Sequence, residues 1–192
     1  MNPNWITAVR FPLALLAFYC LIIDGTKIAL AFAIAIMALA EISDIMDGRV
    51  ARRYGKVSKV GKVLDPIADS FYHLAVFVAF VIAGWMWWSF LIIFILRDLI
   101  SYVFRLISYI KSAELGARRS GKLKAIFQGT AQISTVVLYL IAPESHIAQS
   151  ICFLLLGSAI VMTVISGADY LHQAYKVLRP APHWFWVALH EQ

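Results

Sequence analysis

Four aspartates flank a basic stretch in a chain whose 192 residues are 61% hydrophobic. Asp44 and Asp47 precede the stretch, and Asp65 and Asp69 follow it. A carboxylate inside a membrane-spanning segment costs about 2.5–3.5 kcal/mol, so such residues persist where they face a bundle interior and a partner. Carboxylates with no cysteine among them favour a hard cation, Mg²⁺ or Mn²⁺, bound through oxygen. Two ions about 3.5–4 Å apart would share four such ligands, an arrangement that suits displacement at phosphorus.

The same aspartates also have a purely structural interpretation. They would pair with Arg52, Arg53 and Lys62 and hold the connection between two helices, because ion-pair networks produce similar clusters. Gly48 and Gly61 are open to two interpretations as well, since glycine within a helix costs about 1 kcal/mol relative to alanine. They would allow a phosphate-bearing ligand to approach the backbone, or they would allow membrane helices to pack closely. Spacing alone leaves these alternatives open.

Helical periodicity places the two pairs of aspartates on two helices that are neighbours in the sequence. Asp65 and Asp69 form an i, i+4 pair on the second of these helices, and Tyr72 and His73 continue the same face. Pro66 is typical of a first helical turn, so we expect this helix to begin close to it. Each helix then presents its carboxylates near one end.

Six segments are apolar enough and long enough to span a bilayer, which requires about 20 residues each. The apolar fraction also exceeds the roughly 45–50% of soluble domains. The segments are expected at 9–24, 27–46, 66–84, 86–107, 122–142 and 147–168. We therefore expect an all-α integral membrane protein of six transmembrane helices, organised as one domain over residues 1–192. The stretch MNPNWITAV is expected to lie at the membrane surface, and the first apolar segment is expected to remain as a span because no small-residue cleavage site follows it.

The distribution of positive charge predicts the orientation in the membrane. Of 17 lysines and arginines, only Lys27 lies in the short connections after the first, third and fifth segments. By the positive-inside rule, both termini and both long connections face the cytoplasm, which we take to be that of a bacterial inner membrane. The net charge of +6 then reflects topology and attraction to anionic lipid. Nucleic-acid binding is excluded as the explanation because the charged connections are too short.

A second basic cluster lies in the fourth and fifth segments. Arg97 and Arg105 share a helix face, and Lys122 and Lys124 begin the fifth segment. Arginines within a span need an anionic partner, and arginine is suited to bidentate phosphate recognition. Asp98 is an alternative partner, which would make the cluster structural. If a ligand is the partner, two basic clusters beside one metal site predict a second, phosphorylated ligand.

The spacing D-x2-D-G-x2-A-R-x8-G-x3-D-x3-D resembles the complete signature of the CDP-alcohol phosphotransferases. The resemblance implies transfer of a phosphoalcohol group from a CDP-linked donor to an acceptor hydroxyl, with release of CMP. It also implies a homodimer of six-helix subunits with a polar cavity at the cytoplasmic side. By position, Asp44, Asp47 and Asp65 match ligands to two divalent cations, and Asp69 matches a ligand that is also the proposed general base. The positions that match contacts to the CDP moiety are Gly48, Ala51, Arg52 and Gly61.

Five further segments resemble the phosphatidylglycerophosphate synthases of this family, namely 2–10, 64–69, 97–105, 120–128 and 164–170. They imply CDP-diacylglycerol as donor and glycerol 3-phosphate as acceptor, with the acceptor phosphate on Arg97, Arg105, Lys122 and Lys124. The chain departs from that pattern at Ser70, where lysine is usual, and at Ala125, where threonine is usual. The role of Glu41 is not assigned by the pattern.

Three alternatives to this acceptor and reaction stay open. Cardiolipin synthases of the same superfamily have a similar pattern and take phosphatidylglycerol, and inositol-phosphate or other polyol-phosphate acceptors are also compatible with it. A small membrane transporter is the alternative outside enzymes. It predicts polar residues near the bilayer centre in broken helices, whereas the carboxylates of this chain gather at one membrane face.

Overall fold

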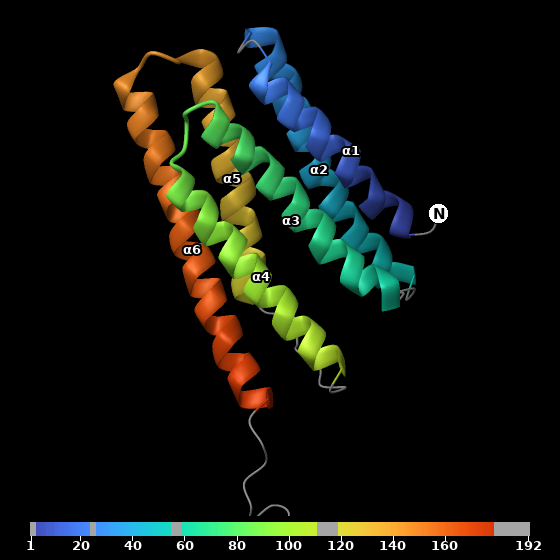
Figure 1. Cartoon of the computed structure of the whole chain (residues 1–192). Coiled ribbons are helices and arrows are strands. Elements are labelled where there is room, and N and C mark those ends of the chain that lie inside the picture. The colour runs from blue at the N-terminus through green and yellow to red at the C-terminus, as the bar shows by residue number, and fades with distance from the viewer. Residues whose placement is uncertain (1–2, 24–25, 55–58, 111–118, 179–192) are drawn as a thin grey trace, which may run out of the picture.

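The computed structural model describes residues 3–23, 26–54, 59–110 and 119–178, and these residues form six α-helices and no strands. The helices are α1 (Pro3–Ile22), α2 (Lys27–Tyr54), α3 (Lys59–Ile82), α4 (Trp88–Ile110), α5 (Arg119–Ile141) and α6 (His146–Leu178). They run up and down in an elongated bundle (Figure 1). Each predicted segment overlaps one helix, so the prediction of six helices is confirmed.

The helices extend beyond the apolar segments that predicted them. The first helix is continuous from Pro3, so residues 3–9 of the stretch expected to lie at the membrane surface form its first turns. The third begins at Lys59, so the prediction that Pro66 marks a first turn is wrong, and this proline lies inside the helix. The reason is that hydropathy detects only the apolar part of a helix, whereas Arg, Lys and Ala continue the helix into polar surroundings.

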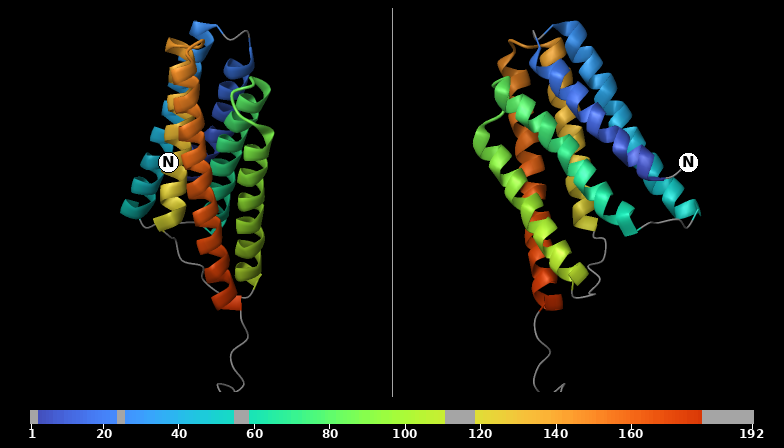
Figure 2. Two further views of the ribbon diagram at one scale, coloured as in Figure 1. Left: turned by 90° about the vertical axis from the view of Figure 1, so that its left-hand side faces the viewer. Right: turned by 45° about the vertical axis from the view of Figure 1, so that its right-hand side comes forward.

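The six helices form two groups of three. Helix α1 packs against both α2 and α3, and helix α6 packs against both α4 and α5. The two groups meet where α2 contacts α5 and where α3 contacts α4 and α5, a boundary that we call the seam. Figure 1 shows the first group on the right and the second on the left, and Figure 2 shows both from two further directions.

The up-and-down order gives the bundle two different ends. At one end, which we call the polar end, α1, α3 and α5 begin and α2, α4 and α6 end; it is the lower end in Figure 1. At the opposite end, the turn end, short connections join α1 to α2, α3 to α4 and α5 to α6. The aspartates of the signature lie on α2 and α3 toward the polar end, and Arg97 lies near the middle of α4.

Aromatic side chains join the two groups toward the turn end. Phe77 of α3 stacks on Phe94 of α4, with ring centroids 4.2 Å apart and planes 1° from parallel. Trp85, in the turn between those helices, stacks on Tyr139 of α5 at 4.1 Å. Gly84 makes this turn possible because its φ of 76° lies in the left-handed region that other residues rarely adopt. These contacts hold the seam together at its apolar end.

The outer surface of the bundle is apolar, and part of the interior is polar. Ile28, Phe32 and Leu154 are more than 60% exposed, whereas Gln132 and Thr163 are fully buried. By length and composition, residues His146–His172 of α6 are long and apolar enough to cross a membrane. Two shorter apolar helical stretches are Val9–Ile22 and Pro66–Ile82.

Candidate active site

The signature residues occupy the last turns of α2 and the first turns of α3, at the polar end. Five of them, Asp44, Asp47, Gly48, Ala51 and Arg52, lie on α2, and Gly61, Asp65 and Asp69 lie on α3. The side chains of all of these except Asp69 lie outside the described part of the structure. Among the described side chains, no group of three His, Cys, Asp or Glu residues could hold a metal ion. The predicted metal ligands therefore share one end of the bundle, and their mutual geometry stays a prediction.

Asp69 is the signature residue whose surroundings the structure describes. Its carboxylate Oδ1 lies 3.4 Å from Nε2 of His73, one helical turn further into the bundle. The Asp69 side chain is 32% exposed, whereas the His73 side chain is 3% exposed. One oxygen of Asp69 is thus engaged by a buried imidazole while the group as a whole remains accessible, as a general base or a metal ligand must be.

His73 is held in turn by Gln132 of α5, across the seam. Gln132 Oε1 lies 2.8 Å from His73 Nδ1, and Gln132 Nε2 donates a hydrogen bond of 2.8 Å to the backbone oxygen of His73. A side-chain amide and an imidazole that are buried without hydrogen bonds would each cost free energy, so these two bonds satisfy groups that would otherwise destabilise the bundle. Asp69, His73 and Gln132 therefore form one connected chain of polar contacts.

A second polar cluster joins α4, α5 and α6. Asp98 Oδ1 accepts hydrogen bonds of 2.8 Å from Arg97 Nη1 and from Lys124 Nζ. Arg97 also donates from Nη2 to Ser166 Oγ at 2.8 Å. Both Asp98 and Lys124 are almost fully buried, at 3% and 4% exposed. The charge of Asp98 therefore neutralises one of the two cations, and the three side chains together keep a net charge of +1.

The four cations predicted to bind the acceptor phosphate are not equivalent in the structure. Arg97 and Lys124 meet at Asp98, whereas Arg105 and Lys122 are exposed. Lys122 is two residues from Lys124, which rotates it by about 200° around α5 and places it on another face. The structure brings together Arg97 and Lys124 and leaves Lys122 apart from them.

Two positions that the family pattern left unexplained have clear surroundings. Ser70 is buried, at 7% exposed, and hydrogen-bonds the Asp98 carboxylate. That carboxylate also forms ion pairs with Arg97 and Lys124. Glu41 of α2 packs over Gly129 of α5, where an added Cβ would lie 2.5 Å from Glu41 Oε1. Glycine at this position leaves room for the carboxylate, whereas a larger residue would require the end of the Glu41 side chain to shift. The sequence contained no signal for this contact, because periodicity gives the face of a residue and not its partner.

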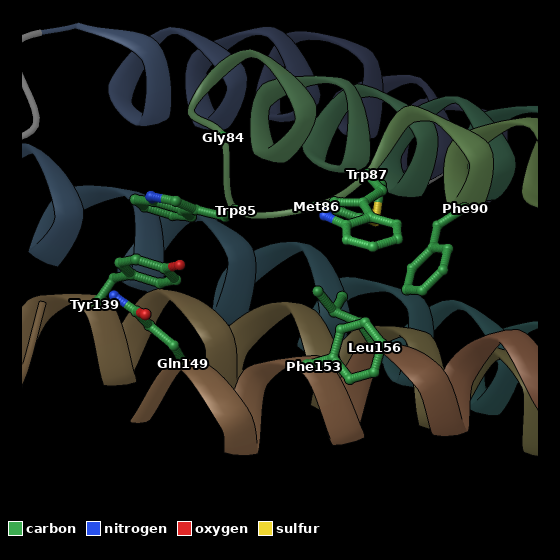
Figure 3. Close-up of a pocket in the computed structure, with 9 residues that line it drawn as sticks. All are labelled: Gly84, Trp85, Met86, Trp87, Phe90, Tyr139, Gln149, Phe153 and Leu156. Carbon is green, nitrogen blue, oxygen red and sulfur yellow. The ribbon is translucent and has the colours of Figure 1, made fainter. Parts of the chain in front are cut away.

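A pocket of about 250 Å³ at the turn end is separate from these polar clusters (Figure 3). Its lining residues are Gly84, Trp85, Met86, Trp87, Phe90, Tyr139, Gln149, Phe153 and Leu156. None of them is charged, so this pocket offers nothing that would bind a pyrophosphate or a divalent cation. The candidate active site is therefore sought among the signature residues and the polar clusters, and not in this pocket.

Comparison with known proteins gives matches over most of the chain. A family model described as CDP-alcohol phosphatidyltransferase matches residues 1–167. A Mycoplasma genitalium protein named CDP-diacylglycerol–glycerol-3-phosphate 3-phosphatidyltransferase is 34% identical over 141 residues, covering 65% of this chain and 60% of the relative. A Mycobacterium tuberculosis protein named probable phosphatidylglycerophosphate synthase is 34% identical over 142 residues, covering 74% and 65%. The chain thus spans less than two thirds of the length of these two relatives.

A third relative matches over nearly its whole length. It is a Yersinia enterocolitica protein with the same name as the Mycoplasma genitalium one, and it is 32% identical over 192 residues. The match covers 92% of this chain and 96% of that relative.

Proposed function

The chain belongs to the CDP-alcohol phosphatidyltransferase family, and we propose that it transfers a phosphatidyl group from CDP-diacylglycerol to glycerol 3-phosphate. The products would be phosphatidylglycerophosphate and CMP. The observation that carries this proposal is the complete signature from Asp44 to Asp69, which lies inside the matched region and at the polar ends of two helices. The names of the relatives guide the choice of acceptor.

The proposal includes a membrane location for all six helices. Large apolar side chains cover the outside while buried glutamines and threonines lie within, which is the distribution expected of a bundle whose surroundings are lipid. The polar end, which carries the long basic connections, would face the cytoplasm. A CDP-diacylglycerol molecule could then keep its acyl chains in the inner leaflet while its pyrophosphate reaches the site.

The donor set at the polar end fits a pair of divalent cations. Asp44, Asp47, Asp65 and Asp69 offer only carboxylate oxygens, the ligands that Mg²⁺ and Mn²⁺ prefer. Asp69, the member that the structure describes, keeps a partly exposed carboxylate at the mouth of an otherwise buried polar chain. When bound, two such cations would neutralise charge on the pyrophosphate of the donor.

The remaining steps would fall to residues of this chain. Gly48, Ala51, Arg52 and Gly61 would hold the CDP moiety, and Asp69 would accept the proton of the acceptor hydroxyl. The acceptor oxygen then forms a bond to the phosphorus that carries the diacylglycerol, while the bond from this phosphorus to the bridging oxygen breaks. The bridging oxygen leaves with CMP, and cationic groups such as Arg52 stabilise its charge.

The acceptor phosphate would bind to the cluster around Asp98. Arg97 Nε has no hydrogen-bond partner among the described residues, although it is buried. Arg97 and Lys124 together carry one positive charge more than Asp98 neutralises, so an incoming phosphate would meet a net positive and partly unsatisfied site. Arg105 would extend this site toward the polar end.

Purified protein with Mg²⁺ or Mn²⁺ is expected to release CMP from CDP-diacylglycerol when glycerol 3-phosphate is supplied. The experiment compares glycerol 3-phosphate, phosphatidylglycerol and inositol phosphate as acceptors, with Asp47→Asn as the inactive control. Release with phosphatidylglycerol or inositol phosphate alone would keep the reaction and replace the acceptor. No metal-dependent release with any acceptor would overturn the proposal. Light scattering of the same sample would test the predicted homodimer.

The unequal surroundings of the cations predict unequal effects on acceptor binding. Arg97→Lys keeps the charge beside Asp98 but loses the forked geometry and the bond to Ser166, so we expect KM for glycerol 3-phosphate to rise about tenfold, as loss of one charged hydrogen bond implies. The matched control is Lys122→Gln, which removes an exposed cation on another face of α5. An equal rise in KM for Lys122→Gln would show that the Asp98 cluster is not the phosphate site.

A further inference from the structure

The polar chain beneath Asp69 is unusual because it is buried at the seam. His73 is 3% exposed and Gln132 is fully buried, yet apolar side chains would join α3 to α5 with no polar groups to satisfy. Of the three residues in this polar chain, Asp69 is the one whose side chain is partly exposed. A role confined to holding two helices together does not require the chain to end on a residue of the signature.

The hydrogen bonds fix the orientation of the imidazole. Gln132 Nε2 donates to the backbone oxygen of His73, so the amide is oriented with its Oε1 toward the ring. Because Oε1 can only accept, His73 Nδ1 must carry the hydrogen of the 2.8 Å bond between them. The other ring nitrogen, Nε2, faces Asp69.

The contact between His73 and Asp69 restricts the carboxylate. His73 Nε2 lies 3.4 Å from Asp69 Oδ1, within the distance of an ion pair between an imidazole and a carboxylate. One oxygen of Asp69 is then engaged from within the bundle, and rotation about the bond that carries the carboxylate is limited. The other oxygen is held in a defined direction relative to α3.

We propose that His73, itself held by Gln132, is a positioning residue that fixes the Asp69 carboxylate for the proton transfer and for cation binding. This inference rests on the function proposed for Asp69. Partners that orient the ligands of a metal typically change metal affinity or activity by about 10- to 100-fold when they are removed. His73 is buried and contacts Asp69, so it would act through that carboxylate.

The test compares His73→Phe, Gln132→Leu and the double variant with the wild-type protein in detergent. Three quantities are measured for each: kcat and KM for CMP release, Mn²⁺ affinity from the electron paramagnetic resonance signal of free Mn²⁺, and the thermal unfolding temperature. For His73→Phe, kcat is expected to fall about 10- to 100-fold and Mn²⁺ affinity to weaken, while both KM values change less than about threefold. Gln132→Leu is expected to change kcat in the same direction by a smaller factor.

The double variant separates positioning from independent effects on folding. Because Gln132 acts through His73, the double variant is expected to be no less active than His73→Phe alone, a strong departure from additivity. The matched control is Thr135→Val, which removes another fully buried polar group of α5 one turn beyond Gln132. Its kcat and Mn²⁺ affinity are expected to match those of the wild-type protein.

The outcomes distinguish failure of this inference from failure of the proposed function. If the wild-type protein releases CMP and neither His73→Phe nor Gln132→Leu changes kcat or Mn²⁺ affinity, the positioning role is wrong and the function stands. If the wild-type protein binds Mn²⁺ without releasing CMP, the function is wrong, and weaker Mn²⁺ binding in His73→Phe still supports positioning. A wild-type protein that does neither overturns both. Should His73→Phe not fold, Gln132→Leu against Thr135→Val decides the matter.

Discussion

Asp69→Asn is expected to reduce CMP release by about 10²- to 10⁴-fold, the range that general-base catalysis contributes. Asparagine has nearly the same size as aspartate and can still hydrogen-bond His73 through its side-chain oxygen, but it cannot take a proton from an acceptor hydroxyl. The fold should therefore survive while the proton transfer is lost. The measurement is single-turnover CMP release with glycerol 3-phosphate, combined with Mn²⁺ binding and thermal unfolding of the same preparation.

The matched control for this variant is Asp169→Asn. Asp169 is an aspartate of α6 outside the signature, and its Oδ2 accepts a 2.6 Å hydrogen bond from Ser120. This variant also neutralises a carboxylate toward the polar end, so it reports any general effect of lost charge, and its activity is expected to stay within a few-fold of wild type. Full activity in Asp69→Asn would disprove the role of Asp69 as the base.

Asp98→Leu is expected to destabilise the fold more than any other single change proposed for this protein, by about 3–5 kcal/mol. Asp98 is 3% exposed and its Oδ1 accepts from both Arg97 and Lys124, so its removal leaves one buried and one partly buried cation without their anion. Removing one partner of a buried ion pair typically costs this amount because the remaining charge is uncompensated. The measurement is the free energy or temperature of unfolding in detergent.

A double variant tests the cause of that loss. Asp98→Leu combined with Lys124→Leu replaces one anion and one cation by apolar side chains, and Arg97 keeps its bond to Ser166. Replacing a buried pair by apolar groups is often neutral or stabilising, so we expect the double variant to unfold at a higher temperature than Asp98→Leu. A double variant that is less stable than the single one would show that packing at Asp98, and not charge, dominates.

The helices were predictable from the sequence, while their ends were not. Apolar segments of about 20 residues identify six helices because lipid requires that length. The polar turns from Lys59 to Asp65 carry no such signal, and Pro66 therefore suggested a later start for α3 than the one observed. Both termini and both long basic connections were predicted to lie on one side, so the helix ends beside them were predicted to lie together. Figure 1 shows this arrangement of helix ends.

The site was predictable as a set of residues but not as a set of contacts. The spacing of the aspartates singled out Asp69, and the face it shares with His73 was visible as an i, i+4 relation. Gln132 lies 59 residues from His73, so only the fold brings the two together. Asp98 was predicted as an alternative partner of the arginines, and its contact with Arg97 is confirmed. Its contact with Lys124, 26 residues away in the sequence, required the fold.

The seam described above has a mechanical consequence for the proposed reaction. The aspartates of the signature belong to the first group of helices, and the cations around Asp98 belong to the second, so donor and acceptor would be held by different groups of helices. The stacked pairs Phe77–Phe94 and Trp85–Tyr139 join the two groups toward the turn end, and His73 and Gln132 join them closer to the proposed site. The separation between the attacking oxygen and the phosphorus would therefore depend on how these contacts hold the two halves of one chain together.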